Sequence, residues 1–493
     1  MPRMLIRSGK DPFTPVSAET TLTQDVFNSN SGNYLFQHAV WKALAVDGTE
    51  LVSNGTLSER GKPARGDAAR INDEFDHFVI PLANAFRPDF IDRLNRLSDL
   101  LEGVTIPVTV TGIGAQAAHG QGAESLAPIA DQVKRFVGLV LDRSASIGVR
   151  GVFTQTYLTQ LGFPEDSIDI IGCPSLFLHG RDFQVHRKID AVGPDSRLAL
   201  NVTPEVPGIG AFATAHAARY PHLTYVPQDA HDLRLMLWGT PFPHVHDSTV
   251  PVHLDHQLYR EDRMRMFVDT WTWYDFLAEH EFAYGTRFHG NVAALLGGTP
   301  AMLLAHDSRT LELAEHHRMP HQIMSELTAD ITAEELYEAT DLTEFNAAMP
   351  ENFDRYTGFL ERNGLDHIWS GGATTTEFDS KLAAADLPPA VHTLGGGLSE
   401  VANRLQWLRG GMVLDITRHP DRYEYPYEHP SWNGAGSRHA RLQRQADEAR
   451  ETQKRQQDEV YARLERLERY ERRTTRGLTR RVLRRVRRYF TRS

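Results

Sequence analysis

The spacing of apolar residues changes repeatedly along the first 180 residues of the chain. Short apolar runs, typical of buried strands, alternate with longer segments in which apolar residues recur every three or four positions, as in helices. The predicted strands are residues 4–6, 77–81, 107–114, 146–150 and 168–174, and the predicted helices are residues 34–45, 90–101, 126–141 and 154–161. This alternation favours a mostly parallel sheet that helices cover on both faces.

The alternation restarts after a polar segment with proline and glycine at residues 183–196. The second series has predicted strands at residues 198–202, 223–226, 250–254, 282–284 and 301–305, and predicted helices at residues 208–219, 229–238, 263–279 and 310–317. We therefore expect an α/β protein with two Rossmann-like domains facing a cleft, residues 1–185 and residues 186–345.

The alternation fades beyond residue 345. Residues 346–437 predict an extension of helices and loops, in which residues 354–363 form a helix that packs back onto the first domain. Residues 438–493 contain no proline and interleave acidic and basic side chains. Apolar residues recur there at Val460, Leu464, Leu467 and Tyr470. This spacing indicates a short coiled coil or a single solvated helix.

The formal net charge of −11 is divided unevenly along the chain. Residues 438–493 carry 19 Lys+Arg and 8 Asp+Glu, a net charge of +11, so the preceding body carries −22. An acidic body disfavours general nucleic-acid binding, and we expect no specific nucleic-acid partner. Residues 477–490 predict a basic amphipathic helix, which suits an anionic membrane surface or an acidic partner, or else forms part of a solvated tail.

Composition narrows the class of protein further. The single cysteine, Cys173, excludes an intrachain disulfide and a cysteine-based metal cluster, and its apolar neighbours indicate a small core residue. The sequence contains no run of about 18 apolar residues, and its N-terminus lacks a secretory apolar segment. We therefore expect a cytoplasmic protein, with attachment to the inner membrane face through the basic tail as a further hypothesis.

Residues 283–300 concentrate side chains that carry chemistry. They predict a strand end, a tight turn and a helix that ends before Pro300. Arg287 and His289 lie in the turn on either side of Phe288, so both can face a cleft while Phe288 packs inward. The start of the helix adds affinity for an anion. Together these groups suit acid catalysis on a phosphorylated or carboxylated substrate.

An Arg-x-His pair in a turn can also simply tie down a surface loop. The apolar strand before it and the apolar helix after it favour a ligand site instead, because open α/β sheets bind ligands at such turns. Asn33 and Arg150 lie at or near other predicted strand-to-helix turns. We expect them at the same cleft as Arg287 and His289.

The motifs around these residues resemble those of one family. They are Gly285-Thr-Arg-Phe-His-Gly290, Gly298-Thr-Pro300, His306-Asp-Ser-Arg-Thr310, Ser31-Gly-Asn33, Ser146-Ile-Gly-Val-Arg150 and Gly172-Cys-Pro-Ser175. Across residues 4–320 the chain resembles the polysaccharide pyruvyl transferase family. The resemblance implies a fold like that of B-type glycosyltransferases. It also implies transfer of the enolpyruvyl unit of phosphoenolpyruvate to a sugar, usually as a ketal bridging two hydroxyls.

The resemblance and the chemistry assign roles to the same residues. Phosphoenolpyruvate carries a phosphate and a carboxylate, so it needs at least two well-placed cations, for which Arg150 and Arg287 are the candidates. His289 is placed to supply or shuttle the proton. Arg309 is expected to hold the departing phosphate, and Asn33 completes the predicted donor site. Phosphoenolpyruvate is a co-substrate, and the mechanism requires no metal or other cofactor.

One turn departs from the pattern of the family. Many members follow the arginine equivalent to Arg150 with an aspartate and a later serine, whereas this chain has Gly151 and Thr154. The cation is kept, but the role of the turn is left open.

Three smaller features have both a functional and a structural interpretation. Gly112-Ile-Gly114-Ala-Gln116 can cradle a phosphate, but close packing of a strand is favoured. His244-Val-His246-Asp247 can bind a metal, although loop placement is favoured because the chain has 23 histidines. Gln228-Asp229-Ala-His231 either contacts a ligand or caps a helix through Asp229.

Other functions and partners remain open at this point. A nucleotide-sugar glycosyltransferase of similar fold, or a non-catalytic scaffold for glycan assembly, would share the same architecture. The expected partners are phosphoenolpyruvate, a glycan or lipid-linked sugar acceptor, an anionic membrane surface and, through the tail, a second copy of the chain.

Overall fold

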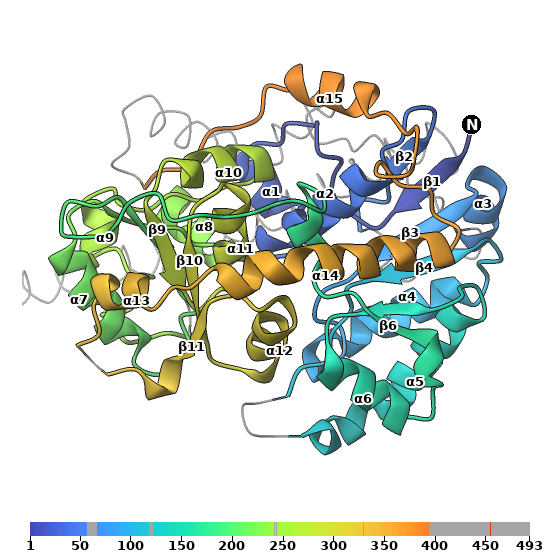
Figure 1. The fold of residues 1–493 in the computed structure, drawn as a ribbon, viewed down its shortest axis with the longest axis horizontal. Helices are drawn as coiled ribbons and strands as arrows, with labels where there is room; N and C mark the ends of the chain where they lie inside the picture. Colours follow the sequence, from blue (N-terminus) through green and yellow to red (C-terminus); the bar gives the residue numbers. More distant parts are fainter. Residues whose placement is uncertain are drawn as a thin grey trace, which may run out of the picture. The chain divides into compact units, whose positions relative to one another are not determined.

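The computed structural model describes residues 1–56, 67–117, 122–240, 242, 244–328 and 330–393, together with Lys454. Two parallel sheets, each flanked by helices, lie next to each other in Figure 1. The predicted class, an α/β fold with two Rossmann-like units, is confirmed. The predicted coiled coil and basic helix of residues 438–493 lie outside the described residues, apart from Lys454.

The first half of the chain supplies strands β1 to β6, and the second half supplies β7 to β11. The strands of the first half are β1 (Arg3–Ile6), β2 (Glu50–Ser53), β3 (His77–Pro81), β4 (Val108–Thr111), β5 (Ile147–Val149) and β6 (Ile168–Ile170). Those of the second half are β7 (Leu198–Asn201), β8 (Leu223–Tyr225), β9 (Phe282–Gly285), β10 (Ala301–Ala305) and β11 (His321–Ile323).

The two sheets have the same strand order. In the first half the order is β2-β1-β3-β4, and a parallel bridge between Ile113 and Val149 continues it into the pair β5-β6. In the second half the order is β8-β7-β9-β10-β11. The connection therefore reverses direction between β1 and β3, and again between β7 and β9. Ligands of doubly wound sheets bind outside the carboxyl ends of the strands at such reversal points.

Helices cover both sheets because most residues of the central strands are apolar and need burial on both faces. In the first half they are α1 (Ala18–Thr23), α2 (Gly32–Leu44), α3 (Asp67–Glu74), α4 (Ile91–Leu101), α5 (Ala130–Leu141) and α6 (Val152–Gln160). The second half has α7 (Ile209–Arg219), α8 (Ala230–Trp238), α9 (Gln257–Arg260), α10 (Thr270–Ala278), α11 (Phe288–Leu296), α12 (Ser308–His317) and α13 (Ala333–Glu338). They are followed by α14 (Thr343–Arg362) and α15 (Thr376–Ala383).

Two predicted elements of the second half are wrong. Residues 250–254 form turns rather than a strand, and the N–H of Val252 donates to the Val250 carbonyl across Pro251. Helix α10 begins at Thr270 rather than at residue 263, because the Asp269 side chain caps its N-terminus. The preceding residues instead extend alongside β8, where Tyr225 exchanges backbone hydrogen bonds of 2.9 and 3.0 Å with Arg263 and Arg265.

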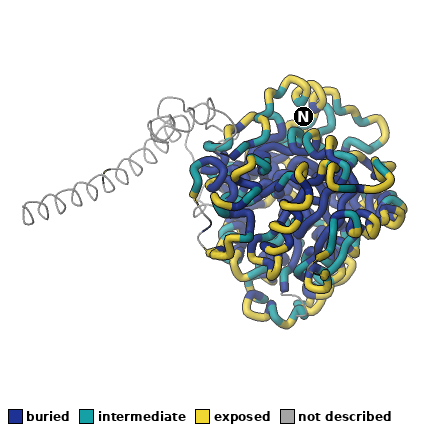
Figure 2. The backbone as a smooth tube through the Cα atoms, turned by 90° about the vertical axis from the view of Figure 1, so that its left-hand side faces the viewer, coloured by how far each residue is buried: buried dark blue, intermediate teal, exposed yellow. Residues whose placement is uncertain are grey.

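Three apolar cores hold the molecule together, and two of them contain residues of both halves. The first, the shared core, brings Ile6 and Val79 of the first sheet together with Ala283 and Leu303 of the second. The second core combines the second sheet with Val26, Phe27 and Tyr34 of the first half, and the third core lies within the first half. Buried backbone fills the interior, and exposed residues gather at peripheral loops (Figure 2). The two halves are therefore packed against each other through side chains as well as linked by the chain.

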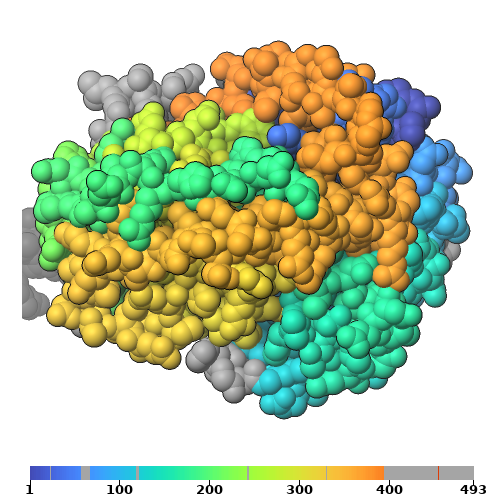
Figure 3. Space-filling model, in the orientation of Figure 1, coloured from blue at the N-terminus to red at the C-terminus, as the bar shows by residue number. Residues whose placement is uncertain are grey.

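Helix α14 returns the chain from the second half to the first. It runs across the face shown in Figures 1 and 3. Near its start, the Asn346 amide bonds the backbone of Val185, and just beyond its end Asn363 accepts a 3.3 Å hydrogen bond from the backbone N–H of Ser146. The predicted return of this helix to the first domain is confirmed.

None of the helices in the described part of the chain is both long enough and apolar enough to cross a lipid bilayer.

Candidate active site

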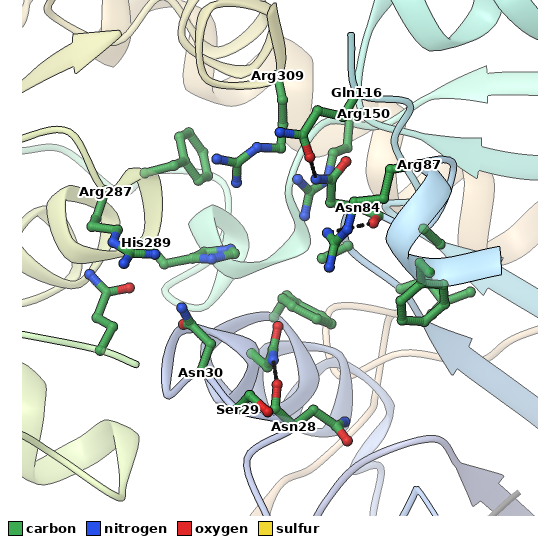
Figure 4. Close-up of a pocket in the computed structure, with 18 of the residues that line it drawn as sticks. Asn28, Ser29, Asn30, Asn84, Arg87, Gln116, Arg150, Arg287, His289 and Arg309 are labelled. Carbon is green, nitrogen blue, oxygen red and sulfur yellow. Dashed lines mark hydrogen bonds between the residues drawn. The ribbon is translucent and has the colours of Figure 1, made fainter. Parts of the chain in front are cut away.

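A cavity of about 340 Å³ lies between the two sheets at the carboxyl ends of their strands. Arginines, amides and one imidazole dominate its lining, as Figure 4 shows. The polar and charged lining residues are Arg7, Asn28, Ser29, Asn30, Asn33, Asn84, Arg87, Arg93, Gln116, Arg150, Gln228, Asp229, Arg287, His289 and Arg309.

Sheet topology explains why six arginines meet here. Arg7 follows β1 directly, Arg150 follows β5 directly, and one residue separates Arg287 from the end of β9. Parallel strands end at one edge of a sheet, so residues far apart in sequence converge on that edge. Among the described lining residues Asp229 is the only carboxylate, so the cavity carries a strong excess of positive charge.

Arg150 is almost fully buried, with 1% of its surface exposed. Its Nε donates to the Gly112 carbonyl at 2.9 Å, while Nη1 is buried and has no acceptor among the described residues. Burial, and then the charges of Arg309 and Arg87, lower the pKa of Arg150 to about 10. The side chain reaches the cavity past Gly114, where a Cβ atom would lie 2.7 Å from Arg150 Cδ. Gly114 therefore permits close packing against Arg150, and the alternative role of the glycine motif in cradling a phosphate stays a prediction.

Arg309 lies in the first turn of α12, whose N-cap is Asp307. One guanidinium nitrogen lies 3.3 Å from Asp307 Oδ2, and the buried Nε has no acceptor within the described residues. Burial opposes ionisation of Asp307, but Arg309, His306 and the bonds from Thr310 outweigh it and lower the pKa of Asp307 to about 2. Asp307 is therefore a carboxylate at neutral pH.

Arg287 is held more tightly than the other arginines. Its guanidinium group pairs with Asp229 and also donates to the Val202 carbonyl at 3.0 Å. Burial lowers the pKa of Arg287, but the charges of Asp229, Tyr225 and Asp232 together raise it above the ordinary value. Asp229 in turn accepts a 2.7 Å hydrogen bond from the Asn30 side chain of the first half.

His289 occupies the first turn of α11, between Phe36 and Phe288, with ring centroids 5.7 and 5.4 Å away. Its Nε2 lies 3.5 Å from the Cys173 thiol. Burial, together with the positive charges of Arg150 and Arg309, holds the pKa of His289 well below its ordinary value. The imidazole is therefore neutral at pH 7 in the empty protein.

The turn after Arg150 has a structural explanation. A Cβ atom on Gly151 would lie 2.5 Å from Glu312 Cγ, so a side chain at this position would displace Glu312. The Glu312 carboxyl accepts a 2.9 Å hydrogen bond from the Thr154 N–H, and the Thr154 hydroxyl accepts one of 3.1 Å from Ala115. The departure from the pattern of the family therefore lets α12 cap the N-terminus of α6.

The structure brings all five predicted site residues to this one cavity: Asn33, Arg150, Arg287, His289 and Arg309. Asn33 uses its amide N–H groups within its own loop, donating to the carbonyls of Phe27 and Asn28. The roles of the five residues in binding and catalysis stay predictions.

Several lining residues were missed by the sequence reasoning. Arg7 satisfied the same criterion as Arg150, since it directly follows a predicted strand. Arg87 and Arg93 lie in a loop and a helix start that carry no such signal, and Gln116 was named only as the last residue of the glycine motif. Asp229 caps α8, as one of its two interpretations predicts, and it also lines the cavity; its contact with a ligand stays a prediction. Among the described residues, no three His, Cys, Asp or Glu side chains are close enough to share a metal ion.

Comparisons with solved structures find low similarity. HepE of Anabaena in complex with UDP-glucose is 13% identical, with coverage of 77% of this chain and 98% of that chain and a TM-score of 0.35. A UDP-GlcNAc 2-epimerase from Neisseria meningitidis is 10% identical, with coverage of 74% and 100% and a TM-score of 0.39. Because these scores are low, the fold assignment rests on the two sheets themselves.

No curated protein has a significantly similar sequence. The family model for polysaccharide pyruvyl transferase matches residues 30–308, more than half of the chain. The matched region contains most of the residues that line the cavity, including Arg150, Arg287 and His289, and ends one residue before Arg309. The chain belongs to the polysaccharide pyruvyl transferase family, a family of transferase enzymes.

Proposed function

We propose that this protein transfers the pyruvyl group of phosphoenolpyruvate to two hydroxyls of a sugar in a polysaccharide or glycan precursor, forming a ketal. One observation carries the choice of donor: Arg150 and Arg309 each present a buried guanidinium nitrogen without an acceptor among the described residues, on one cavity. Buried donors of this kind are normally satisfied by a partner. A ligand with both a phosphate and a carboxylate supplies acceptors for both arginines.

His289 lines the same cavity as Arg150 and Arg309 and lies beside Arg287 in Figure 4. Because its imidazole is neutral in the empty protein, it first acts as a base and takes the proton of an attacking sugar hydroxyl. The resulting imidazolium then gives a proton to the methylene carbon of the donor, which becomes a methyl group.

The remaining bonds follow from this proton transfer. The oxygen of the first hydroxyl bonds to the central carbon of the donor, and the bond from that carbon to the phosphate oxygen breaks with its electron pair. The departing phosphate stays paired with Arg309 and takes up the proton released when the second hydroxyl attacks. The products are a ketal and inorganic phosphate.

The acceptor sugar belongs at the other wall of the cavity. Asn28, Ser29, Asn30 and Gln228 line that wall and carry no charge. Amides and hydroxyls exchange hydrogen bonds with sugar hydroxyls, whereas the arginine wall prefers anions. The Gln228 Nε2 is buried and has no acceptor in the described part of the chain, so it is available to a hydroxyl.

Calorimetric titration with phosphoenolpyruvate, with UDP-glucose as the competing type of donor, tests this function. We expect saturable binding of phosphoenolpyruvate to the unmodified protein. Arg150→Met keeps the apolar stem of the side chain but removes the charge, and should weaken binding by about tenfold to a hundredfold. The control Arg135→Met removes an exposed arginine of α5 that pairs with Asp99 and Glu102, and should leave binding unchanged.

Two outcomes would overturn the proposal. Binding of UDP-glucose without binding of phosphoenolpyruvate would indicate a nucleotide-sugar transferase. Equal binding of phosphoenolpyruvate by the unmodified protein and Arg150→Met would place the donor outside this cavity.

A further inference from the structure

Each arginine that the second half contributes to the cavity is connected to the first half through a carboxylate. Arg309 pairs with Asp307, and Arg287 pairs with Asp229; all four residues come from the second half. The first half supplies an amide to each carboxylate: Gln116 Nε2 donates to Asp307 at 3.3 Å, and Asn30 Nδ2 donates to Asp229 at 2.7 Å. The same sequence of groups, amide to carboxylate to arginine, thus occurs twice.

We propose that Gln116 and Asn30 are positioning residues, which fix Arg309 and Arg287 for the donor only when the two halves are docked. We call the two sets amide relays: Gln116–Asp307–Arg309 and Asn30–Asp229–Arg287. The inference rests on the proposed function, which assigns Arg309 to the donor, and it adds Arg287 to the residues that hold the donor.

The chemistry of the carboxylates fixes the direction of each amide. An ionised carboxylate only accepts hydrogen bonds, so Gln116 must turn its NH2 group toward Asp307, whose pKa of about 2 keeps it ionised. The Gln116 oxygen is then free to accept, and it accepts from the Asn84 amide. In the second relay, the Asn30 oxygen accepts a 2.8 Å hydrogen bond from the Gly32 N–H. Both amides are therefore held at both ends.

The first relay reaches further, to an arginine of the first half. The Asn84 carbonyl accepts a 2.8 Å hydrogen bond from Arg87, which also lines the cavity. Arg87 and Arg309, from opposite halves, are thus joined through Asn84, Gln116 and Asp307. Figure 4 shows the part of this path from Arg87 to Gln116. Burial lowers the pKa of Arg87 most, and the positive charge of Arg309 lowers it further. The second effect reflects repulsion between the two guanidinium groups. The relay holds them near each other against that repulsion.

Backbone contacts beside each relay keep the halves in register. The Ser308 hydroxyl donates to the Ala117 carbonyl at 2.8 Å, one residue from Gln116. On the other side of the cavity the N–H of Ser31 donates to the Gln228 carbonyl at 2.9 Å, and the N–H of Ala230 donates to the Ser29 carbonyl at 2.9 Å. These contacts hold the loops of Gln116 and Asn30 against the second half, so both amides reach their carboxylates.

A double-mutant cycle on binding tests the proposal, because Gln116 also lines the cavity and can in principle touch the ligand itself. The cycle uses Gln116→Ala, Arg309→Ala and the double variant, with phosphoenolpyruvate and, separately, inorganic phosphate as calorimetric probes. We expect Gln116→Ala alone to weaken binding of phosphoenolpyruvate about tenfold. In the Arg309→Ala background the same substitution should have little further effect, because its target has been removed.

Further variants separate positioning from simple loss of structure. Gln116→Glu places a second carboxylate against Asp307 and should weaken binding more than Gln116→Ala does. The matched control is Gln155→Ala in α6, which removes a half-buried amide of the first half that bonds only a backbone carbonyl. It should leave the dissociation constant unchanged. Asn30→Ala with Arg287→Ala repeats the cycle for the second relay.

The outcomes distinguish this inference from the proposed function. If phosphoenolpyruvate binds and the effects of Gln116→Ala and Arg309→Ala multiply, Gln116 acts directly and the relay is overturned while the donor stands. If inorganic phosphate binds but phosphoenolpyruvate does not, the proposed donor is wrong. The double-mutant cycle measured with phosphate then shows whether Gln116 acts through Arg309. If neither anion binds the unmodified protein, both are overturned.

Discussion

His289 combines two properties that would conflict in an isolated residue. It must handle a proton, yet burial and two neighbouring arginines hold its pKa well below the ordinary value. The conflict is resolved if the donor brings negative charge into the cavity, because an anion beside Arg150 and Arg309 offsets their effect on the imidazole. Donor binding would then raise the pKa of His289 and prepare it to receive a proton.

Nuclear magnetic resonance of ¹⁵N-labelled histidine tests this coupling. In the empty protein we expect His289 to stay neutral from pH 7 to below pH 6, and its signal is identified by its loss in His289→Gln. Saturation with phosphoenolpyruvate should raise its pKa by at least one unit, about 1.4 kcal/mol of interaction. Titration of the empty protein near the ordinary value of 6.5 would contradict the burial of the ring and the influence of the arginines.

At the level of single residues, the sequence identified polar side chains at the ends of strands or within a few residues of them, although it missed Arg7, which directly follows β1. Arg150, Arg287 and Arg309 could be found because a polar side chain at the end of an apolar run has few structural uses. Gln116 and Asn30 carry no comparable signal, because the importance of an amide depends on which carboxylate lies opposite. That partner is set by the docking of the two halves, which the local sequence does not encode.

The N-terminus of α6 lies against the side of α12, and a carboxyl group of α12 takes the place of the usual N-cap side chain. The N-cap of α6 is Gly151, which has no side chain, and Glu312 of α12 accepts from the Thr154 N–H instead. Burial raises the pKa of Glu312 to about 7, although its bonds to Thr154 and the charge of Arg150 favour ionisation. The contact lies directly behind Arg150 and so supports the arginine wall of the cavity.

Substitution of Glu312 should therefore separate capping from charge. Glu312→Gln keeps an acceptor for Thr154 and should retain nearly full stability at pH 7. Glu312→Ala leaves the N-terminus of α6 without its cap and should lower the free energy of unfolding by about 1–3 kcal/mol. Urea unfolding of both variants measures the difference. Equal stability of the two variants would show that the hydrogen bond contributes nothing.

The sequence predicted most of the elements because the sheets are parallel and buried, so their strands are near-continuous apolar runs. It failed where an apolar run serves another purpose. Residues 263–266 alternate polar and apolar side chains, which is a strand pattern that the prediction of a helix overlooked. Arg263 and Arg265 bond the backbone of β8, and Asp269 ends the extended segment. The short strands β2 and β11 were missed because β2 is buried only at one end and β11 has no fully buried residue, so neither forms a clear apolar run.

Acid lability is expected of the whole molecule. Five histidines, His77, His216, His256, His280 and His316, have pKa values lowered by burial to about 4. The unfolded chain binds protons at these groups near pH 6.5, but the folded protein does not until about pH 4. Stability should therefore be fully present above pH 6.5 and fall as the pH is lowered toward 4, by about 1 kcal/mol per pH unit for each histidine.

Urea unfolding between pH 7.5 and 4.5 measures this slope. His77→Gln, which keeps a polar partner for the Thr109 hydroxyl, should reduce the slope by about one proton equivalent below pH 6. A free energy of unfolding that does not change across this range would contradict the neutral state of these side chains in the folded protein.

The path of α14 has a consequence for synthesis of the protein. Phe353, Tyr356 and Phe359 belong to the shared core, where Tyr356 stacks on Phe177 with ring centroids 5.0 Å apart. Strand β6 ends at Ile170, whereas α14 ends at Arg362, so 192 further residues must leave the ribosome before this surface is covered. At typical rates of about 5–20 residues per second, the delay is about 10–40 seconds. The first half of the protein is translated first, but its part of the shared core is covered only after α14 has been made.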